Sequence, residues 1–306
     1  MHLTRYIPTG ITYMCAIVSV VFLLTASLAA QTREADYPYV TAEPQKTGWP
    51  LTNEELTYVL KPEYERRPGS EAMKHLPAMW PVVPSAGHWT GTAWLDTHAK
   101  LAAHVTGRKG PVDVLLVGDS ITQQWGSPLD GKPLNDAWKK HLGRYSAVNI
   151  GIGGDKTQNV LWRLDHGGVD GLEPKCIVLM IGNNNMFFTQ ETGIEPAARG
   201  VKACVDNLRR KLPMVPIVVV KILPAHEPGN PFYEDIKKSN AALDQLKLGG
   251  QPGITVLDLT SDFTIAEGRL NKELFTPDNV HLSTAGYDIY ARRLSPLISK
   301  LPTMSR

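Results

Sequence analysis

Five short runs of apolar, mostly β-branched residues alternate with amphipathic segments between residues 112 and 299. The runs predict strands at Val112–Val117, Ala147–Ile150, Cys176–Ile181, Ile217–Ile222 and Ile254–Leu257. Strands that are buried on both faces consist of continuous apolar runs of this kind. The amphipathic segments predict helices at Leu134–Leu142, Thr157–Leu164, Pro196–Leu212 and Tyr233–Leu248, with a last helix from about Ser283 towards Ser299. This alternation predicts an α/β fold with a parallel five-stranded sheet and helices on both faces.

The last predicted helix has one apolar stripe. Tyr287, Tyr290, Leu294 and Leu297 recur at helical spacing along it. Pro296 is expected to end or kink the helix, because proline has no backbone N–H to donate.

A serine follows the first predicted strand, and an aspartate and a histidine precede the last helix. Ser120 lies in the sequence Gly-Asp-Ser-Ile-Thr at positions 118–122, and Asp278 stands three positions before His281. A serine hydroxyl is a poor nucleophile until an imidazole takes its proton, and a carboxylate fixes the tautomer of that imidazole. The three residues therefore predict a serine hydrolase, with Ser120 as nucleophile, His281 as general base and Asp278 as the partner of the base.

Two more candidates follow the second and third predicted strands. Gly154 ends a glycine-rich turn, whose backbone N–H groups can point at an anion. Asn184 is the middle one of three consecutive asparagines, and its side-chain amide can donate to a developing oxyanion. Taken singly, Ser120 could be a helix cap, and Gly154 and Asn184 could be plain turn residues. Their joint occurrence at the ends of parallel strands, where sites form in such sheets, favours a catalytic site.

Composition and motif spacing count against several other functions. The net charge of +2 gives no electrostatic case for a nucleic acid or an anionic membrane as partner. Thr122 stands where the G-x-S-x-G nucleophile elbow needs glycine, and Lys156 where a dinucleotide fingerprint needs its third glycine. No spacing of cysteine and histidine suggests zinc. We therefore expect neither a metal nor a cofactor.

Four motifs give the chain a resemblance to a known family. In order, the chain contains Gly118-Asp119-Ser120, Gly151-x-x-Gly154, Gly182-x-Asn184 and Asp278-x-x-His281. These match the four sequence blocks of the SGNH (GDSL) hydrolase superfamily. Residues 149–164 and Trp94-x-x-x-His98 are typical of the branch that contains the catalytic subunit of the intracellular type Ib platelet-activating-factor acetylhydrolase. The similarity runs from about Trp94 to Leu301.

The resemblance implies a flavodoxin-like three-layer α/β/α sandwich that hydrolyses esters. It assigns the nucleophile to Ser120, the base to His281 and the partner of the base to Asp278. The backbone N–H groups of Ser120 and Gly154, together with the side chain of Asn184, would form the oxyanion hole. The mechanism that the resemblance implies needs no metal or cofactor.

The same resemblance bears on the substrate, on assembly and on two neighbouring residues. It favours a small acyl group, most simply acetyl, and the similar intracellular enzymes pair as dimers, so a homodimer is one expected assembly. Asp119 is structural in the family and takes no step in the mechanism. Asn183 stands where the branch often has threonine, and Asn184 is assigned by register.

The N-terminus predicts export. Residues 1–30 have the pattern of a signal peptide: one arginine and no acid up to Met14, an apolar run over Cys15–Leu24, and small residues at Ser27 and Ala29. The run is shorter than the roughly 18–20 residues of a membrane-spanning helix. We expect a periplasmic or extracellular protein without stable membrane association after cleavage; an uncleaved N-terminal anchor is the alternative.

Residues 31–93 form a proline- and tryptophan-rich arm ahead of a hydrolase domain at 94–306. One short helix is predicted at Thr52–Leu60. The arm either wraps the catalytic domain or shapes its substrate cleft. Cys176 and Cys204 are expected to be buried free thiols, although export would permit a disulfide.

The expected export of the protein limits the range of substrates that it would meet. An exported esterase meets acetylated polysaccharide readily, so we expect an O-acetylesterase acting on carbohydrate. Trp80, Trp89 and Trp125 could stack on sugar rings, although burial in a core is commoner for tryptophan. The alternatives are a lysophospholipase or broad carboxylesterase, a transferase or thioesterase with the same residues, and a carbohydrate-binding protein on a hydrolase scaffold.

Overall fold

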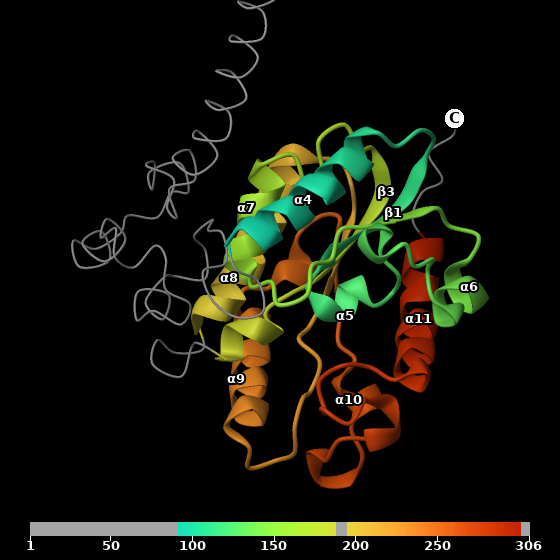
Figure 1. Cartoon of the computed structure of the whole chain (residues 1–306). Coiled ribbons are helices and arrows are strands. Elements are labelled where there is room, and N and C mark those ends of the chain that lie inside the picture. Colours follow the sequence, from blue (N-terminus) through green and yellow to red (C-terminus); the bar gives the residue numbers. More distant parts are fainter. Residues whose placement is uncertain (1–90, 188–194, 301–306) are drawn as a thin grey trace, which may run out of the picture.

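The computed structural model describes residues 91–187 and 195–300. Within them five strands form one sheet in the order β2-β1-β3-β4-β5, and all four pairings are parallel (Figure 1). The strands are β1 (Val112–Gly118), β2 (Ala147–Asn149), β3 (Pro174–Met180), β4 (Ile217–Val220) and β5 (Ile254–Leu257). The predicted parallel five-stranded sheet is confirmed, and its strand ends differ from the prediction by no more than two residues.

Helices cover both faces of the sheet (Figure 1). One face carries α4 (Gly91–Thr106), α7 (Thr157–Asp165), α8 (Glu195–Lys211) and α9 (Pro231–Gln245). The other face carries α5 (Ser120–Gln123), α6 (Asp136–Leu142), α10 (Thr260–Phe263) and α11 (Thr284–Ser299). Short 3₁₀ turns lie at Pro128–Asp130, Asn183–Phe187, Leu248–Gly250, Ala266–Gly268 and Lys272–Leu274. The three-layer α/β/α architecture is therefore confirmed.

Alternate residues of each strand build the two cores. Leu115 and Val117 of β1 pack under α4, α7 and α8, whereas Val114 and Leu116 pack under α6 and α11. Side chains of a strand point to opposite faces with a period of two, so each strand contributes to both layers. Most strand positions are therefore apolar, which is why the strands were recognisable as apolar runs.

Two features of the helices differ from the prediction. Helix α4 was not predicted, and it begins at Gly91, ahead of the predicted domain boundary at residue 94. Pro296 lies inside α11 and does not end it. The N–H that proline lacks would have bonded the carbonyl of Arg292, and both residues are exposed, so the missing hydrogen bond lies on the exposed side of the helix.

The sheet separates the two cysteines of the described residues. Cys176 on β3 belongs to the core on the α11 side, and Cys204 on α8 belongs to the core on the α7 side. Both are buried and free, as predicted. Burial raises the pKa of the Cys176 thiol to about 12 and also raises that of Cys204. Because the sheet lies between them, the two thiols cannot form a disulfide with each other.

The predicted signal peptide at 1–30, the 31–93 arm and its helix at Thr52–Leu60 lie outside the described residues. In the part of the chain that the structure does describe, no helix has both the length and the apolar character needed to cross a membrane.

Candidate functional site

A serine, a histidine and an aspartate lie in hydrogen-bonding series at one edge of the sheet. His281 Nε2 lies 2.8 Å from Ser120 Oγ, although the two residues are 161 positions apart. His281 Nδ1 lies 2.7 Å from Asp278 Oδ2. Ser120 is the first residue of α5, directly after β1, and the other two precede α11. A hydroxyl, an imidazole and a carboxylate in this order can move a proton from the hydroxyl to the imidazole.

The turn before α11 holds the aspartate in one orientation. Asp278 Oδ1 accepts hydrogen bonds from the N–H groups of Val280 and His281, both at 2.9 Å, and from Thr276 Oγ1 at 2.7 Å. Burial by itself would raise the pKa of Asp278, but the hydrogen bonds led by that of the His281 side chain outweigh it and hold the pKa below its usual range. The Asp278 carboxylate is therefore charged at neutral pH and can accept the hydrogen bond of His281.

Helix α5 presents the serine. Asp119 caps this helix, since its Oδ1 accepts from the N–H of Ile121 at 3.0 Å. The alternative interpretation of Ser120 as a helix cap is therefore wrong: the cap is Asp119, and Ser120 is the first helical residue. Tyr287 of α11 donates its hydroxyl to the carbonyl of Ile121 at 2.6 Å, which ties α11 to α5.

A glycine-rich loop between β2 and α7 passes directly beside the serine. Gly154 has φ +81°, a backbone conformation that favours glycine. A Cβ added to Gly153 would lie 3.6 Å from Ser120 Cβ, and one added to Gly151 would lie 2.5 Å from the backbone nitrogen of Gln123. Gln123 Oε1 also accepts from the N–H of Gly153 at 2.7 Å. The loop and α5 are thus packed backbone against backbone.

Two of the three consecutive asparagines, Asn184 and Asn185, have different hydrogen-bond partners. Asn184 Nδ2 donates to the carbonyl of Asp155 at 2.9 Å, directly after the glycine-rich loop. Asn185 is buried, accepts from the N–H of Thr157 at 3.1 Å, and donates to Thr157 Oγ1 and Gln158 Oε1, both at 3.0 Å. The amide of Asn184 therefore lies beside the loop, while that of Asn185 holds the start of α7.

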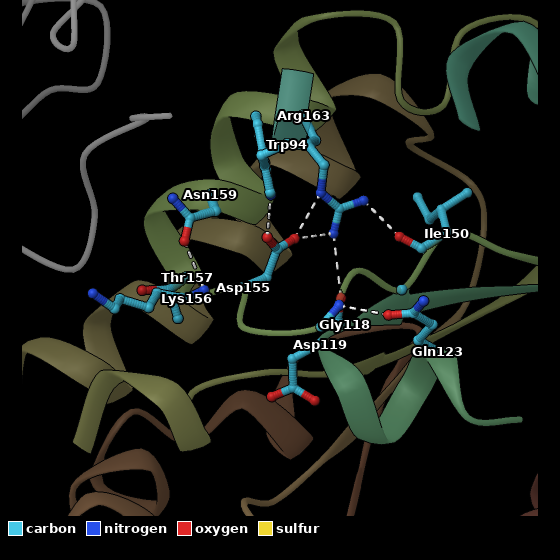
Figure 2. Close-up of polar contacts among 12 residues, drawn as sticks. Trp94, Gly118, Asp119, Gln123, Ile150, Asp155, Lys156, Thr157, Asn159 and Arg163 are labelled. Carbon is cyan, nitrogen blue, oxygen red and sulfur yellow. Dashed lines mark hydrogen bonds and ion pairs between the residues drawn. The ribbon is translucent and has the colours of Figure 1, made fainter. Parts of the chain in front are cut away.

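A buried cluster of charged and aromatic side chains lies behind the loop, and Figure 2 shows it. Arg163 Nε lies 2.8 Å from Asp155 Oδ2, and Trp94 Nε1 donates to Asp155 Oδ1 at 2.7 Å. Arg163 also donates to the carbonyls of Ile150 at 2.6 Å and Gly118 at 3.2 Å. Burial raises the pKa of Asp155 to about 6, against the charge of Arg163 and the hydrogen bond from Trp94.

Sequence reasoning gave no role to Asp155, Arg163 or Gln123. The stretch 149–164 and Trp94 had been singled out only as typical of one branch of a family. No spacing rule indicates that the Arg163 side chain turns back to the ends of two strands, because its partners lie 8, 13 and 45 positions away.

Trp125 is part of the core. It is 1% exposed and packs edge-on against Trp138 and Tyr287, with ring centroids 5.7 Å and 4.7 Å away. Sugar stacking by Trp125 is therefore a wrong interpretation. Trp80 and Trp89 lie outside the described residues. Within residues 91–187 and 195–300, no group of three or more histidine, cysteine, aspartate or glutamate side chains is arranged to hold a metal ion.

Comparison with known proteins identifies relatives across the described part of the chain. The model of the GDSL-like lipase/acylhydrolase family matches residues 116–289. Platelet-activating factor acetylhydrolase IB subunit alpha1 of Bos taurus is 30% identical over 213 residues, 70% of this chain and 85% of that protein. Subunit alpha2 of Rattus norvegicus is 31% identical over 209 residues, 68% and 84% respectively. The fold is shared with a GDSL-like lipase of Bacteroides thetaiotaomicron, with a TM-score of 0.54 and 20% identity over 66% of this chain and 97% of that one.

Proposed function

Because the chain belongs to the GDSL-like lipase/acylhydrolase family and is an ester hydrolase, we propose that it cleaves esters of small acyl groups through an acyl-enzyme on Ser120. One observation carries this proposal: His281 lies 2.8 Å from Ser120 Oγ and 2.7 Å from Asp278. In that series His281 Nδ1 donates its hydrogen to the carboxylate, and Nε2 is left to accept the proton of the serine hydroxyl.

In the first step Ser120 Oγ attacks the ester carbonyl while His281 takes the hydroxyl proton. The carbonyl oxygen becomes an oxyanion, and its donors are the N–H groups of Ser120 and Gly154 and the side-chain amide of Asn184. The first N–H groups of a helix have no acceptor within the helix, which suits the N–H of Ser120 to this task. The amide nitrogen of Asn184 donates one hydrogen to Asp155 and has a second to donate.

In the second step the protonated His281 gives its proton to the leaving alcohol, and the acyl group stays on Ser120. Water then attacks the acyl-enzyme with His281 again as base, and the acid leaves. The exposed fractions of 29% for the side chain of His281 and 50% for that of Asp278 support this step, since water has to reach the imidazole.

Acetyl esters of carbohydrates are the proposed substrates. The bovine and rat relatives are acetylhydrolases by name, which supports a short acyl group. The carbohydrate part rests on the proposed signal peptide at residues 1–30, because an exported esterase meets acetylated polysaccharides. A homodimer, as in the family resemblance, is the proposed assembly.

A lipolytic activity is the second candidate. The family to which the chain belongs is described as lipase/acylhydrolase, so long-chain esters or lysophospholipids are substrates of the same chemistry. Acyl-chain length separates the two candidates, because a short-chain site excludes long acyl groups by shape.

The test is ester hydrolysis by the full chain, with p-nitrophenyl acetate, p-nitrophenyl palmitate and acetylated xylan as substrates. Ser120→Ala is compared with Ser295→Ala, a matched variant whose serine hydroxyl donates to the carbonyl of His141 on the far side of α11. We expect acetate release from the first and third substrates, lost in Ser120→Ala and kept in Ser295→Ala, with an acetyl adduct on the peptide that contains Ser120.

Other outcomes would change the proposal. Palmitate release that exceeds acetate release would favour the lipolytic candidate. Unchanged turnover in Ser120→Ala would overturn the mechanism, and binding of xylan without serine-dependent turnover would favour a carbohydrate-binding protein.

A further inference from the structure

The buried cluster of Trp94, Asp155 and Arg163 bonds the carbonyls of Gly118 and Ile150, as Figure 2 shows. These carbonyls and the backbone of Asp155 lie close in sequence to Ser120 and Gly154, and the carbonyl of Asp155 accepts from Asn184. We infer that this cluster is the positioning device of the oxyanion hole: it holds the donor groups of Ser120, Gly154 and Asn184 in one fixed arrangement. The inference rests on the proposed function, because it concerns the same site.

Arg163 joins the ends of β1 and β2, the strands that precede Ser120 and the glycine-rich loop. Its Nη2 donates to the carbonyl of Gly118, two residues before Ser120, at 3.2 Å. Its Nη1 donates at 2.6 Å to the carbonyl of Ile150, where the glycine-rich loop begins. The Gly118 carbonyl also accepts from the N–H of Ile152 at 3.2 Å. The guanidinium therefore fixes the distance between the start of α5 and the loop.

Asp155 extends the same frame to the other two donors. Its backbone follows Gly154 directly, and its carbonyl accepts the hydrogen bond of Asn184 at 2.9 Å. Its carboxylate is held by Arg163 on one oxygen and by Trp94 on the other. A shift of Asp155 would therefore move the Gly154 N–H and the Asn184 amide together.

Stability alone does not account for this buried ion pair. Arg163 is 1% exposed and Asp155 is completely buried. Replacing a buried ion pair by well-packed apolar side chains is often neutral or stabilising, because both charges lose their hydration. The contacts of Arg163 to two backbone carbonyls are what apolar side chains could not supply, and those carbonyls lie beside the proposed donors.

Trp94 is the member of the cluster whose effect on the proposed donors is least direct, because it bonds the Asp155 carboxylate and not the backbone beside a donor. It lies on α4, is fully buried, and packs against the rings of His98 and Trp162. Among the residues that the structure describes, its link to the site is the hydrogen bond to Asp155. Removal of its N–H takes the Trp94 hydrogen bond from Asp155 Oδ1, so the carboxylate is held less firmly, with Arg163 still bound to the other oxygen. Any effect on catalysis then passes through Asp155.

The experiment compares Trp94→Phe with Trp138→Phe in the full chain. Trp138 is 1% exposed and so is also buried, but it lies in the opposite core, and its Nε1 has no hydrogen-bond partner among the residues that the structure describes. Both variants exchange an indole for a phenyl ring, and only Trp94→Phe removes a hydrogen bond. Values of kcat and KM for p-nitrophenyl acetate are measured at a temperature at which circular dichroism shows both variants folded.

We expect kcat of Trp94→Phe to fall by about tenfold to a hundredfold, the cost of a small misplacement of catalytic groups. KM should stay within about twofold, because the lost interaction is made in the transition state. Trp138→Phe should change neither constant by more than about twofold. Equal effects of the two variants on kcat would overturn the inference.

A second comparison tests whether Trp94 acts through the proposed donors. In an Asn184→Ala background, Trp94→Phe should lower kcat by less than about threefold more, because coupled residues are not additive. Full additivity would contradict the inference.

If Trp94→Phe does not fold, Arg163→Lys takes its place: lysine keeps the charge but cannot bond both carbonyls. Unchanged kcat in Arg163→Lys would then overturn it. Ser120→Ala is measured alongside, and its full activity would instead overturn the proposed function.

Discussion

Asn184 Nδ2 lies 2.9 Å from the carbonyl oxygen of Asp155, so the middle asparagine of three is anchored to the residue after the glycine-rich loop. Asn185 has the same side chain but donates to Thr157 and Gln158 instead. This difference makes the contribution of each asparagine to catalysis testable on its own.

Replacing the asparagines one at a time should give three different results. Asn184→Ala should lower kcat by about 10²–10³-fold, the usual cost of one oxyanion donor. Asn183→Ala should leave kcat within about threefold. Asn185→Ala should lower the melting temperature, since it removes three hydrogen bonds that the buried Asn185 side chain makes to Thr157 and Gln158. Steady-state kinetics and thermal melts check all three, and a larger loss of kcat in Asn183→Ala would move the donor to that residue.

Asp278→Asn should lower kcat by about 10⁴-fold, because an amide does not hold the imidazole in the tautomer that accepts the serine proton. Thr276→Val is the graded companion, since it removes one of the hydrogen bonds that Asp278 accepts and leaves the carboxylate in place. We expect a loss of less than about tenfold for Thr276→Val. A similar loss in both variants would argue against an ionic role for Asp278.

The stability that the charge of Asp278 provides should depend on pH with a defined sign. Its pKa is lowered in the folded chain, so the unfolded chain binds the proton more readily. The contribution is therefore present above the ordinary aspartate pKa of about 3.9 and is lost as the pH falls below it. Urea unfolding of wild type and Asp278→Asn should show a difference that shrinks between pH 5 and pH 3, values chosen to bracket that pKa. A difference that grows on acidification would contradict this.

Asp119 should show the opposite pH dependence. Burial raises its pKa to about 7, against the hydrogen bond from the N–H of Ile121, and its Oδ2 has no hydrogen-bond partner among the described residues. The folded chain therefore binds this proton more readily, and wild type loses stability as the pH rises from about 4 towards 7.

Asn at position 119 cannot ionise but can still cap α5. The free energy of unfolding of Asp119→Asn, relative to wild type, should therefore increase with pH by up to about 1.4 kcal/mol per pH unit across that window. This difference in the free energy of unfolding is measured by urea titrations at pH 5 and pH 8, which lie on either side of the pKa of about 7. A constant difference would show that Asp119 does not titrate there.

Gly151→Ala should damage the site through the backbone. The added methyl group would lie 2.5 Å from the nitrogen of Gln123 and 2.9 Å from the carbonyl oxygen of Asp119, and neither backbone atom can move without moving α5. We expect a drop in kcat together with a drop in melting temperature. Gly171→Ala is the matched control, because no atom lies within 4 Å of its added carbon, although its φ of +78° adds strain. Equal kcat in Gly151→Ala and wild type would contradict the close packing of loop and helix.

The sheet and the candidate site were predictable to different degrees. The central strands β1, β3 and β4 are apolar at most consecutive positions because they are buried on both faces, so they stood out. Ser120, Asp278 and His281 were selected because each chemical type needs the others, and the structure places them in series. Helix α4 was missed, since its first turn adjoins a proline-rich stretch that gives no helical periodicity.

The surroundings of the Arg163 and Trp125 side chains could not be predicted from the sequence. Both are almost fully buried, yet Arg163 is an ion that donates to backbone carbonyls, whereas Trp125 packs against aromatic rings in an apolar core. Residue type and spacing do not distinguish a tryptophan that lines a surface from one inside a core. Nor do they show which distant carbonyls a long charged side chain will reach.

The separation of 161 positions between Ser120 and His281 has a consequence for biosynthesis. A ribosome that has just made Ser120 must add the whole of β2 to β5 before His281 exists. Helix α11 must then dock, since Tyr287 bonds the carbonyl of Ile121 on α5. Under the proposed mechanism, a nascent chain that stops before His281 therefore lacks its base and should release no acid from the esters around it.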